Sequence, residues 1–302
     1  MKTINRIFLF GDSWIEGQGT YESITSDGRY LEPDLPLAPN ESGSINEWRK
    51  QNSWNKFIKE ITNCNVENYA VQGSSNYAQF GHIEGIANTL TKTDLVIIGF
   101  TSKLRDREGI RYSFDMMNRN NIFVSQPSPL NQVVGWEKLS IDDFNFGFNE
   151  HHLNNYSFNS FNEKNFTEKF IQDYFISLHN DMVYEHIAQT NYYFLQERFK
   201  SLGFNLICFD LFEQYLNPIH VDENLNIDEN VYINYGKKTM NEYLIEYEIK
   251  NIKDSDIGIW EWGGHRPDLN GKIVHPNQHG IKIYVDYLFK EFLPNHYKFQ
   301  PN

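Results

Sequence analysis

The chain has 302 residues, which is enough for one large domain or two small ones with a sizeable core. Hydrophobic residues make up 40% and charged residues 22%, which is typical of a globular rather than a disordered protein. The formal net charge of −13 argues against a nucleic-acid or anionic-membrane partner, and no apolar run approaches the ~20 residues of a membrane span.

The N-terminus combines a basic start with a short apolar run that ends in Gly-Asp-Ser at residues 11–13. A signal peptide needs a longer apolar stretch and a small-residue cleavage site, so residues 4–10 are predicted to be a buried strand instead. Ordinary secretion is therefore not indicated, and we expect a place in the cytoplasm or in a virion. Cys64 and Cys208 lie far apart, which favours two buried thiols over a disulfide.

The next elements alternate in type. Residues 53–61 have helical spacing with Ser53 as a candidate N-cap, and residues 66–70 form a short predicted strand. A predicted helix at 77–90 leads to a near-continuous apolar run at 94–100. Such runs are typical of parallel strands that are covered on both faces.

After residue 101 the sequence is rich in Asn and Phe and has few regular patterns. It is too long for a loop in a compact domain, so residues of about 103–165 are predicted to be an insertion, with a lid as the candidate role. Helical periodicity then covers 167–202, a buried strand 204–209 and an amphipathic helix 279–293. Strands that alternate with helices predict an α/β fold with a parallel sheet, in one domain that spans the whole chain.

Small polar turns follow three of the predicted strands, at residues 11–13, 72–74 and 99–101. Ligands bind outside the carboxyl ends of strands in open α/β sheets, so these turns are expected to converge on one crevice. Ser13 is either a helix N-cap or a nucleophile. A nucleophile needs a base, and the best candidate is His275, which directly precedes the predicted C-terminal helix.

Three sequence blocks resemble those of the SGNH (GDSL-type) hydrolases, which are esterases and lipases. They are Gly-Asp-Ser at 11–13, Asn-Tyr-Ala-Val-Gln-Gly-Ser-Ser at 68–75 and His-Pro-Asn at 275–277. The resemblance covers residues of about 1–105 and 204–293. It implies a flavodoxin-like three-layer α/β/α sandwich with a parallel sheet.

The resemblance also implies the roles of individual residues. Ser13 is expected to be the nucleophile and an oxyanion donor, Gly73 to give its N–H to the oxyanion, and His275 to be the base. Asp12 is expected to bond the backbone across its turn rather than to take part in the chemistry.

The sequence departs from the family pattern at two sites. The third block of the family carries an Asn that donates to the oxyanion, whereas Thr101 stands there in this chain, with Asn76 as the alternative donor. The family has Asp three residues before the catalytic His, whereas this chain has Lys272. We therefore expect Asp268, or a backbone carbonyl, to hold the far nitrogen of His275.

Several further residues are of types that often take part in function. His265 is a candidate second catalytic histidine, and the tryptophans of residues 260–262 are candidates for stacking on a sugar or for packing in the core. His151-His152, and His220 with Asp222, lack further spaced partners for a metal ion. We expect no metal and no cofactor.

The sequence is compatible with two functional classes. The first is a serine ester hydrolase, either a carboxylesterase or a carbohydrate O-deacetylase, that acts on a small-molecule or glycan ester. The second is a non-catalytic glycan- or partner-binding protein on the same fold.

Overall fold

The computed structural model describes residues 1–21, 42–71, 74–101, 122–125, 145–148, 181–212, 214–216, 218–219, 225–265 and 275–300. Contacts divide the chain into two compact units. The first unit consists of Met1–Lys103, Glu185–Pro267 and Ile273–Asn302, and the second of Leu104–Tyr184 and Asp268–Lys272.

Most of the predicted insertion at 103–165 lies outside the described residues. Its described parts are β5 (Ile122–Ser125) and β6 (Asn145–Phe148), which pair with each other in antiparallel fashion. The insertion and its role as a lid therefore stay predictions.

A parallel sheet forms the centre of the first unit. Among the described residues it has four strands in the order β3 (Asn65–Asn68), β2 (Arg6–Phe10), β4 (Asp94–Phe100) and β7 (Asn205–Asp210). The predicted α/β fold with a parallel sheet is confirmed. The strands β3 and β4 flank β2 on opposite sides, so the direction in which the chain builds the sheet reverses at β2. Ligands bind at such switch points in open α/β sheets.

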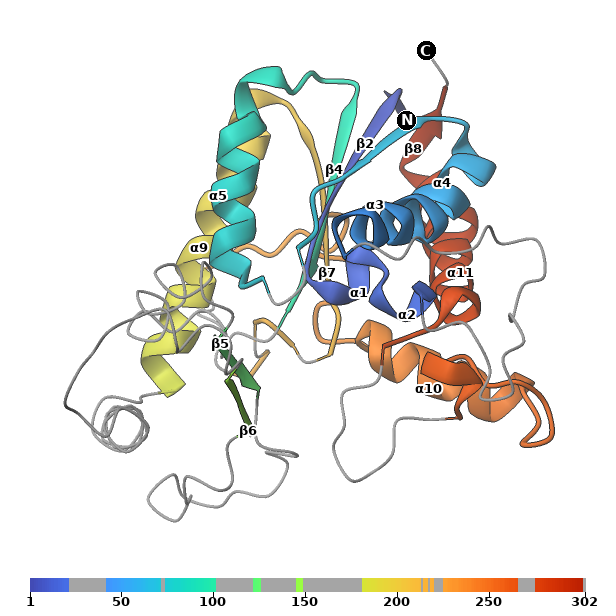
Figure 1. Ribbon diagram of the computed structural model, residues 1–302. Helices are drawn as coiled ribbons and strands as arrows, with labels where there is room; N and C mark the ends of the chain where they lie inside the picture. The colour runs from blue at the N-terminus through green and yellow to red at the C-terminus, as the bar shows by residue number, and fades with distance from the viewer. Residues whose placement is uncertain are drawn as a thin grey trace. The chain divides into compact units, whose positions relative to one another are not determined.

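Helices cover both faces of this sheet. Figure 1 shows α5 (Asn76–Ile86) and α9 (Asp181–Leu202) on one side. On the other side lie α3 (Ser42–Asn52), α4 (Trp54–Thr62) and α11 (Gln278–Asp286). The fold is thus a three-layer α/β arrangement.

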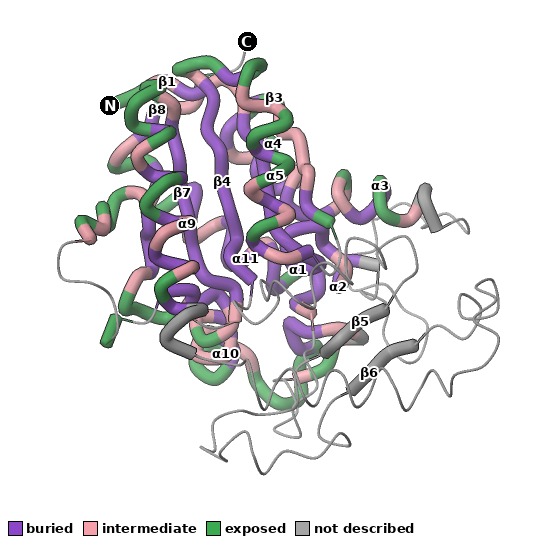
Figure 2. Tube along the Cα trace, turned by 90° about the vertical axis from the view of Figure 1, so that its left-hand side faces the viewer, coloured by how far each residue is buried: buried purple, intermediate pink, exposed green. Residues whose placement is uncertain are grey.

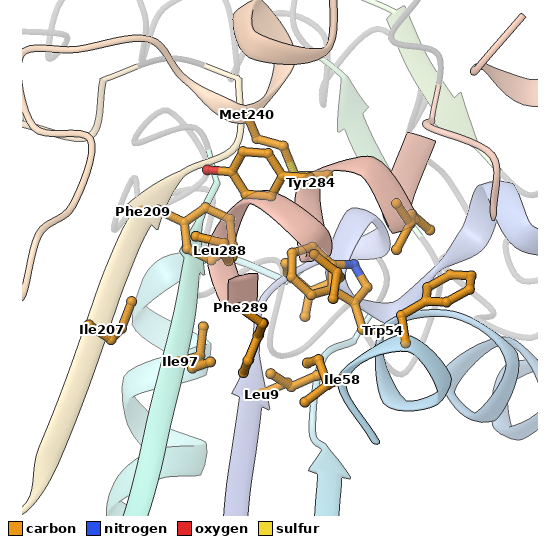
Figure 3. Packing of buried hydrophobic residues seen from close by; sticks show 14 of the residues in the cluster. Leu9, Trp54, Ile58, Ile97, Ile207, Phe209, Met240, Tyr284, Leu288 and Phe289 are labelled. Atoms are coloured by element: carbon orange, nitrogen blue, oxygen red, sulfur yellow. The ribbon is translucent and has the colours of Figure 1, made fainter. Parts of the chain in front are cut away.

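Successive strand residues face opposite layers, as the pleat of a strand requires. Phe8, Val96 and Cys208 belong to the cluster on the side of α5 and α9. Leu9 and Ile97 belong to the other cluster, where Figure 3 shows them beneath Trp54, Tyr284 and Leu288. Every residue of β4 is buried, as Figure 2 shows, which accounts for its continuous apolar sequence.

The helix α4 follows from its apolar spacing. Trp54, Phe57 and Ile58 lie at positions i, i+3 and i+4 and form its buried face. Full burial of a side chain of this size contributes about 1.5–3 kcal/mol. Ser53 occupies the predicted N-cap position, but its hydroxyl makes no capping hydrogen bond and donates instead to the Glu16 carbonyl at 3.4 Å.

Short elements lie near the two termini of the chain. The predicted strand 4–10 is divided at Asn5, because β1 (Lys2–Ile4) leaves the main sheet and pairs with β8 (Tyr297–Phe299). After α11 the chain continues through a π-helix (Tyr287–Phe292) and a 3-10 turn (Leu293–Asn295).

Both cysteines are free and buried, as predicted, and burial raises the pKa of the Cys64 and Cys208 thiols. In the part of the chain that the structure describes, no helix is long and apolar enough to cross a lipid bilayer.

Candidate active site

Ser13 lies directly beyond the carboxyl end of β2. It is the first residue of α1 (Ser13–Glu16), and Asp12 is the N-cap, whose carboxylate accepts from the Trp14 N–H at 2.9 Å. Asp12 therefore has the structural role that the sequence predicted. Ser13 is only 6% exposed, and its own N–H makes no hydrogen bond within the described residues.

His275 approaches Ser13 from the other end of the chain. Its Nε2 lies 2.8 Å from Ser13 Oγ. The histidine precedes α11, and Asn277 is the N-cap of that helix, accepting from the Gly280 N–H at 3.1 Å. The side-chain amide of Asn277 also donates to the carbonyls of Gly258 and Trp260, so the histidine loop is tied to a neighbouring segment.

That neighbouring segment supplies the acid. His275 Nδ1 contacts the carboxylate of Glu261, which begins a 3-10 turn (Glu261–Gly263). An antiparallel bridge between Trp260 and Pro276 sets the two residues side by side, since the Glu261 N–H donates to the His275 carbonyl at 3.0 Å. Glu261 was not among the residues that the sequence singled out.

The two expected acceptors for His275 Nδ1 were Asp268 and a backbone carbonyl. In the structure this nitrogen faces the carboxylate of Glu261. Asp268 and Lys272 both lie outside the described residues. The acid that the geometry provides is thus carried fourteen positions before the histidine and not within its own loop.

The order of atoms is Ser13 Oγ, His275 Nε2, His275 Nδ1 and the Glu261 carboxylate. A carboxylate only accepts hydrogen bonds, so Nδ1 carries the ring proton and Nε2 is left as an acceptor for the Ser13 hydroxyl proton. A ring in this tautomer can take a proton from the serine, and the carboxylate stabilises the imidazolium that results.

No protein-family model and no curated protein matches this chain. What the site can do is therefore argued from its own geometry.

The space allowed to the histidine loop depends on one glycine. Gly19 lies in α2 (Gln18–Tyr21), and a Cβ added there would stand 2.1 Å from the Pro276 carbonyl oxygen and 3.1 Å from His275 Cβ. Only glycine lets α2 approach the loop so closely, so this short helix lies directly against the backbone of the histidine loop.

The expected oxyanion donors have other partners where the structure describes them. The Thr101 hydroxyl donates to Asp12 Oδ2 at 2.9 Å, and this uses its single proton. Asn76 accepts from the Thr101 N–H at 2.8 Å and donates to its carbonyl at 3.0 Å. Gly73 lies outside the described residues. The oxyanion roles of Gly73, Thr101 and Asn76 therefore stay predictions.

We expect Thr101→Val to lower stability by about 2 kcal/mol, because it removes a hydrogen bond to the fully buried carboxylate of Asp12. Denaturant unfolding measures this, with Thr101→Ser, which keeps a hydroxyl, as the matched control. If Thr101 donates to an oxyanion instead, the valine variant will keep its stability and lose about 10²–10³-fold in rate.

The remaining candidates do not join the site. His265 Nδ1 lies 3.1 Å from Glu248 Oε1 rather than at Ser13. Trp260 is 1% exposed, so it packs in the core and presents no face to a sugar. The candidate metal ligands His151, His152, His220 and Asp222 lie outside the described residues, and the described ones contain no group of His, Cys, Asp or Glu that could hold a metal ion.

Proposed function

We propose that this protein is a serine ester hydrolase in which Ser13 is the nucleophile, His275 the general base and Glu261 the acid that holds the base. The observation that supports this is the alignment of the Ser13 hydroxyl, both ring nitrogens of His275 and the Glu261 carboxylate. The resemblance of three sequence blocks to SGNH hydrolases supports the same chemistry, because it points to Ser13 and His275 on independent grounds.

In the proposed reaction, Ser13 Oγ forms a bond to the ester carbonyl carbon while its proton passes to His275 Nε2. The carbonyl oxygen becomes an oxyanion, and the Ser13 N–H is a donor in position to serve it. His275 then returns the proton to the alcohol oxygen as the ester C–O bond breaks. Water repeats the sequence on the acyl-serine and releases the carboxylic acid.

The substrates that we propose are small-molecule esters or the O-acetyl groups of glycans. Both follow from the resemblance, and both need only the nucleophile, the base and an oxyanion site. General-base assistance of the proposed kind contributes about 10²–10⁴-fold to the rate.

The test has two readouts on the wild-type protein. We expect hydrolysis of p-nitrophenyl acetate well above the buffer rate, and covalent labelling by a fluorophosphonate probe that peptide mass spectrometry locates at Ser13. Acetylated oligosaccharides then separate a deacetylase from a carboxylesterase. Absence of both turnover and labelling would refute the hydrolase and favour a glycan- or partner-binding protein.

A further inference from the structure

A buried carboxylate lies behind the segment that carries Glu261. Glu248 is in α10 (Met240–Asn251), a helix that begins with a capping box formed by Thr239 and Glu242. Glu248 is 1% exposed, and its Oε2 accepts from the indole N–H of Trp260 at 2.9 Å. Its Oε1 accepts from the Ile259 N–H at 3.4 Å. A buried carboxylate needs such partners, because an uncompensated charge is costly there.

His265 reaches the same carboxylate from the other end of the segment. Its Nδ1 lies 3.1 Å from Glu248 Oε1, and its Nε2 lies 2.9 Å from the backbone oxygen of Asp256. Both ring nitrogens of His265 therefore face acceptor oxygens, and the ring lies between the Glu248 carboxylate and the backbone of Asp256.

These contacts bracket Glu261 on both sides. Trp260 directly precedes it and His265 follows four residues later, and both converge on Glu248. The backbone between them is closed by the Gly258 N–H, which donates to the Gly263 carbonyl at 2.9 Å. A Cβ at Gly258 would stand 1.9 Å from the Gly264 carbonyl oxygen, so the closure is tight.

We propose that Glu248 and His265 are positioning residues that hold Glu261 against His275, and that His265 is not a second catalytic histidine. This inference rests on the proposed hydrolase function. The Glu261 carboxylate must stay within hydrogen-bond reach of His275 Nδ1 to fix its tautomer. A displacement of about 1 Å in such a group costs up to about 10²-fold in rate.

The kinetic test uses His265→Asn and Glu248→Gln. We expect each to lower kcat about 10- to 100-fold, with KM changed less than about twofold, because the proposed role of each residue acts through Glu261 and not through contact with the substrate. The side chain of His265 is 28% exposed and that of Glu248 is 1% exposed, so the histidine variant is the one that best keeps the fold. Thermal melting identifies the temperature range in which each variant is folded.

The matched control is Glu246→Gln on the same helix. Glu246 pairs with Lys238 and Lys250 at the surface, two positions from Glu248. Within the described residues, its hydrogen bonds and ion pairs go to these two lysines and not to the segment that carries Glu261. Its variant removes a carboxylate from α10 without touching the proposed support. We expect wild-type kcat and KM.

A spectroscopic readout tests the positioning without any substrate. The His275 Nδ1 proton that faces Glu261 should give a downfield proton resonance, assigned by its loss in His275→Gln. We expect the resonance to move or vanish in folded His265→Asn and to stay in Glu246→Gln. If wild type hydrolyses no ester, the function fails while this readout still tests the support.

Two outcomes would overturn the inference. One is an unchanged resonance together with an unchanged kcat in folded His265→Asn and Glu248→Gln. The other is a loss of activity in His265→Asn as complete as in His275→Ala, with the His275 resonance intact, since that would make His265 catalytic in its own right.

Discussion

Alanine at Ser13 and alanine at His275 should each lower kcat by about 10⁴- to 10⁶-fold, and the double variant should lose no more than either alone. The Ser13 hydroxyl and His275 Nε2 lie 2.8 Å apart and exchange one proton in the proposed attack. If either side chain is removed, the other can no longer take part in that proton transfer, so the second substitution adds no further loss. The measurement is p-nitrophenyl acetate turnover under saturating substrate, with the melting temperature recorded for each variant.

Ser53→Ala is the control for the loss of a buried hydroxyl. Ser53 is fully buried, and its hydroxyl donates to the Glu16 carbonyl instead of facing a histidine. Its variant should keep the wild-type rate within a few-fold. Additive losses in the Ser13 and His275 double variant would mean that the two residues act separately, which contradicts a nucleophile–base pair.

Glu261→Gln should lower kcat by about 10³- to 10⁴-fold and leave the fold intact. Glutamine keeps the size of the side chain but carries no charge, so it cannot stabilise the imidazolium of His275 and can favour the wrong tautomer. Single-turnover kinetics separate this effect on chemistry from effects on binding.

Asp268→Asn is the matched comparison for the acid. It makes the same chemical change, the loss of one carboxylate charge, at the acidic residue that the sequence offered as a candidate. We expect near-wild-type turnover, because the carboxylate of Glu261 already occupies His275 Nδ1. A large loss in Asp268→Asn with an unimpaired Glu261→Gln would assign the acid to Asp268 and refute the structural assignment.

The fold was largely predictable because its signals are local. Residues 94–100 form an apolar run that matches β4. A strand that is covered on both faces needs apolar residues at nearly every position, so its sequence is easy to recognise. The helical spacing of Trp54, Phe57 and Ile58 likewise predicts the buried face of α4 from local sequence alone. The helix α3 has no such signal, because Ile45 and Trp48 are its only apolar side chains and give its sequence no clear helical periodicity.

The site was predictable only in part. Ser13 and His275 are marked by a turn after a buried strand and by a helix start, and the structure brings the two together. Glu261 depends on the antiparallel bridge between Trp260 and Pro276, a long-range pairing of single residues without a sequence pattern. The available signal was that Glu261 is the one acid between two residues already singled out, Trp260 and His265.

The same bridge has a mechanical consequence. The segments of Glu261 and His275 hydrogen-bond to each other through their backbones, so a shift of one segment is passed to the other. Ser13 lies in α1, after β2, and meets His275 through the side-chain contact between Ser13 Oγ and His275 Nε2. The placement of these two parts of the chain relative to each other therefore decides whether the hydroxyl and the ring nitrogen stay within hydrogen-bond reach.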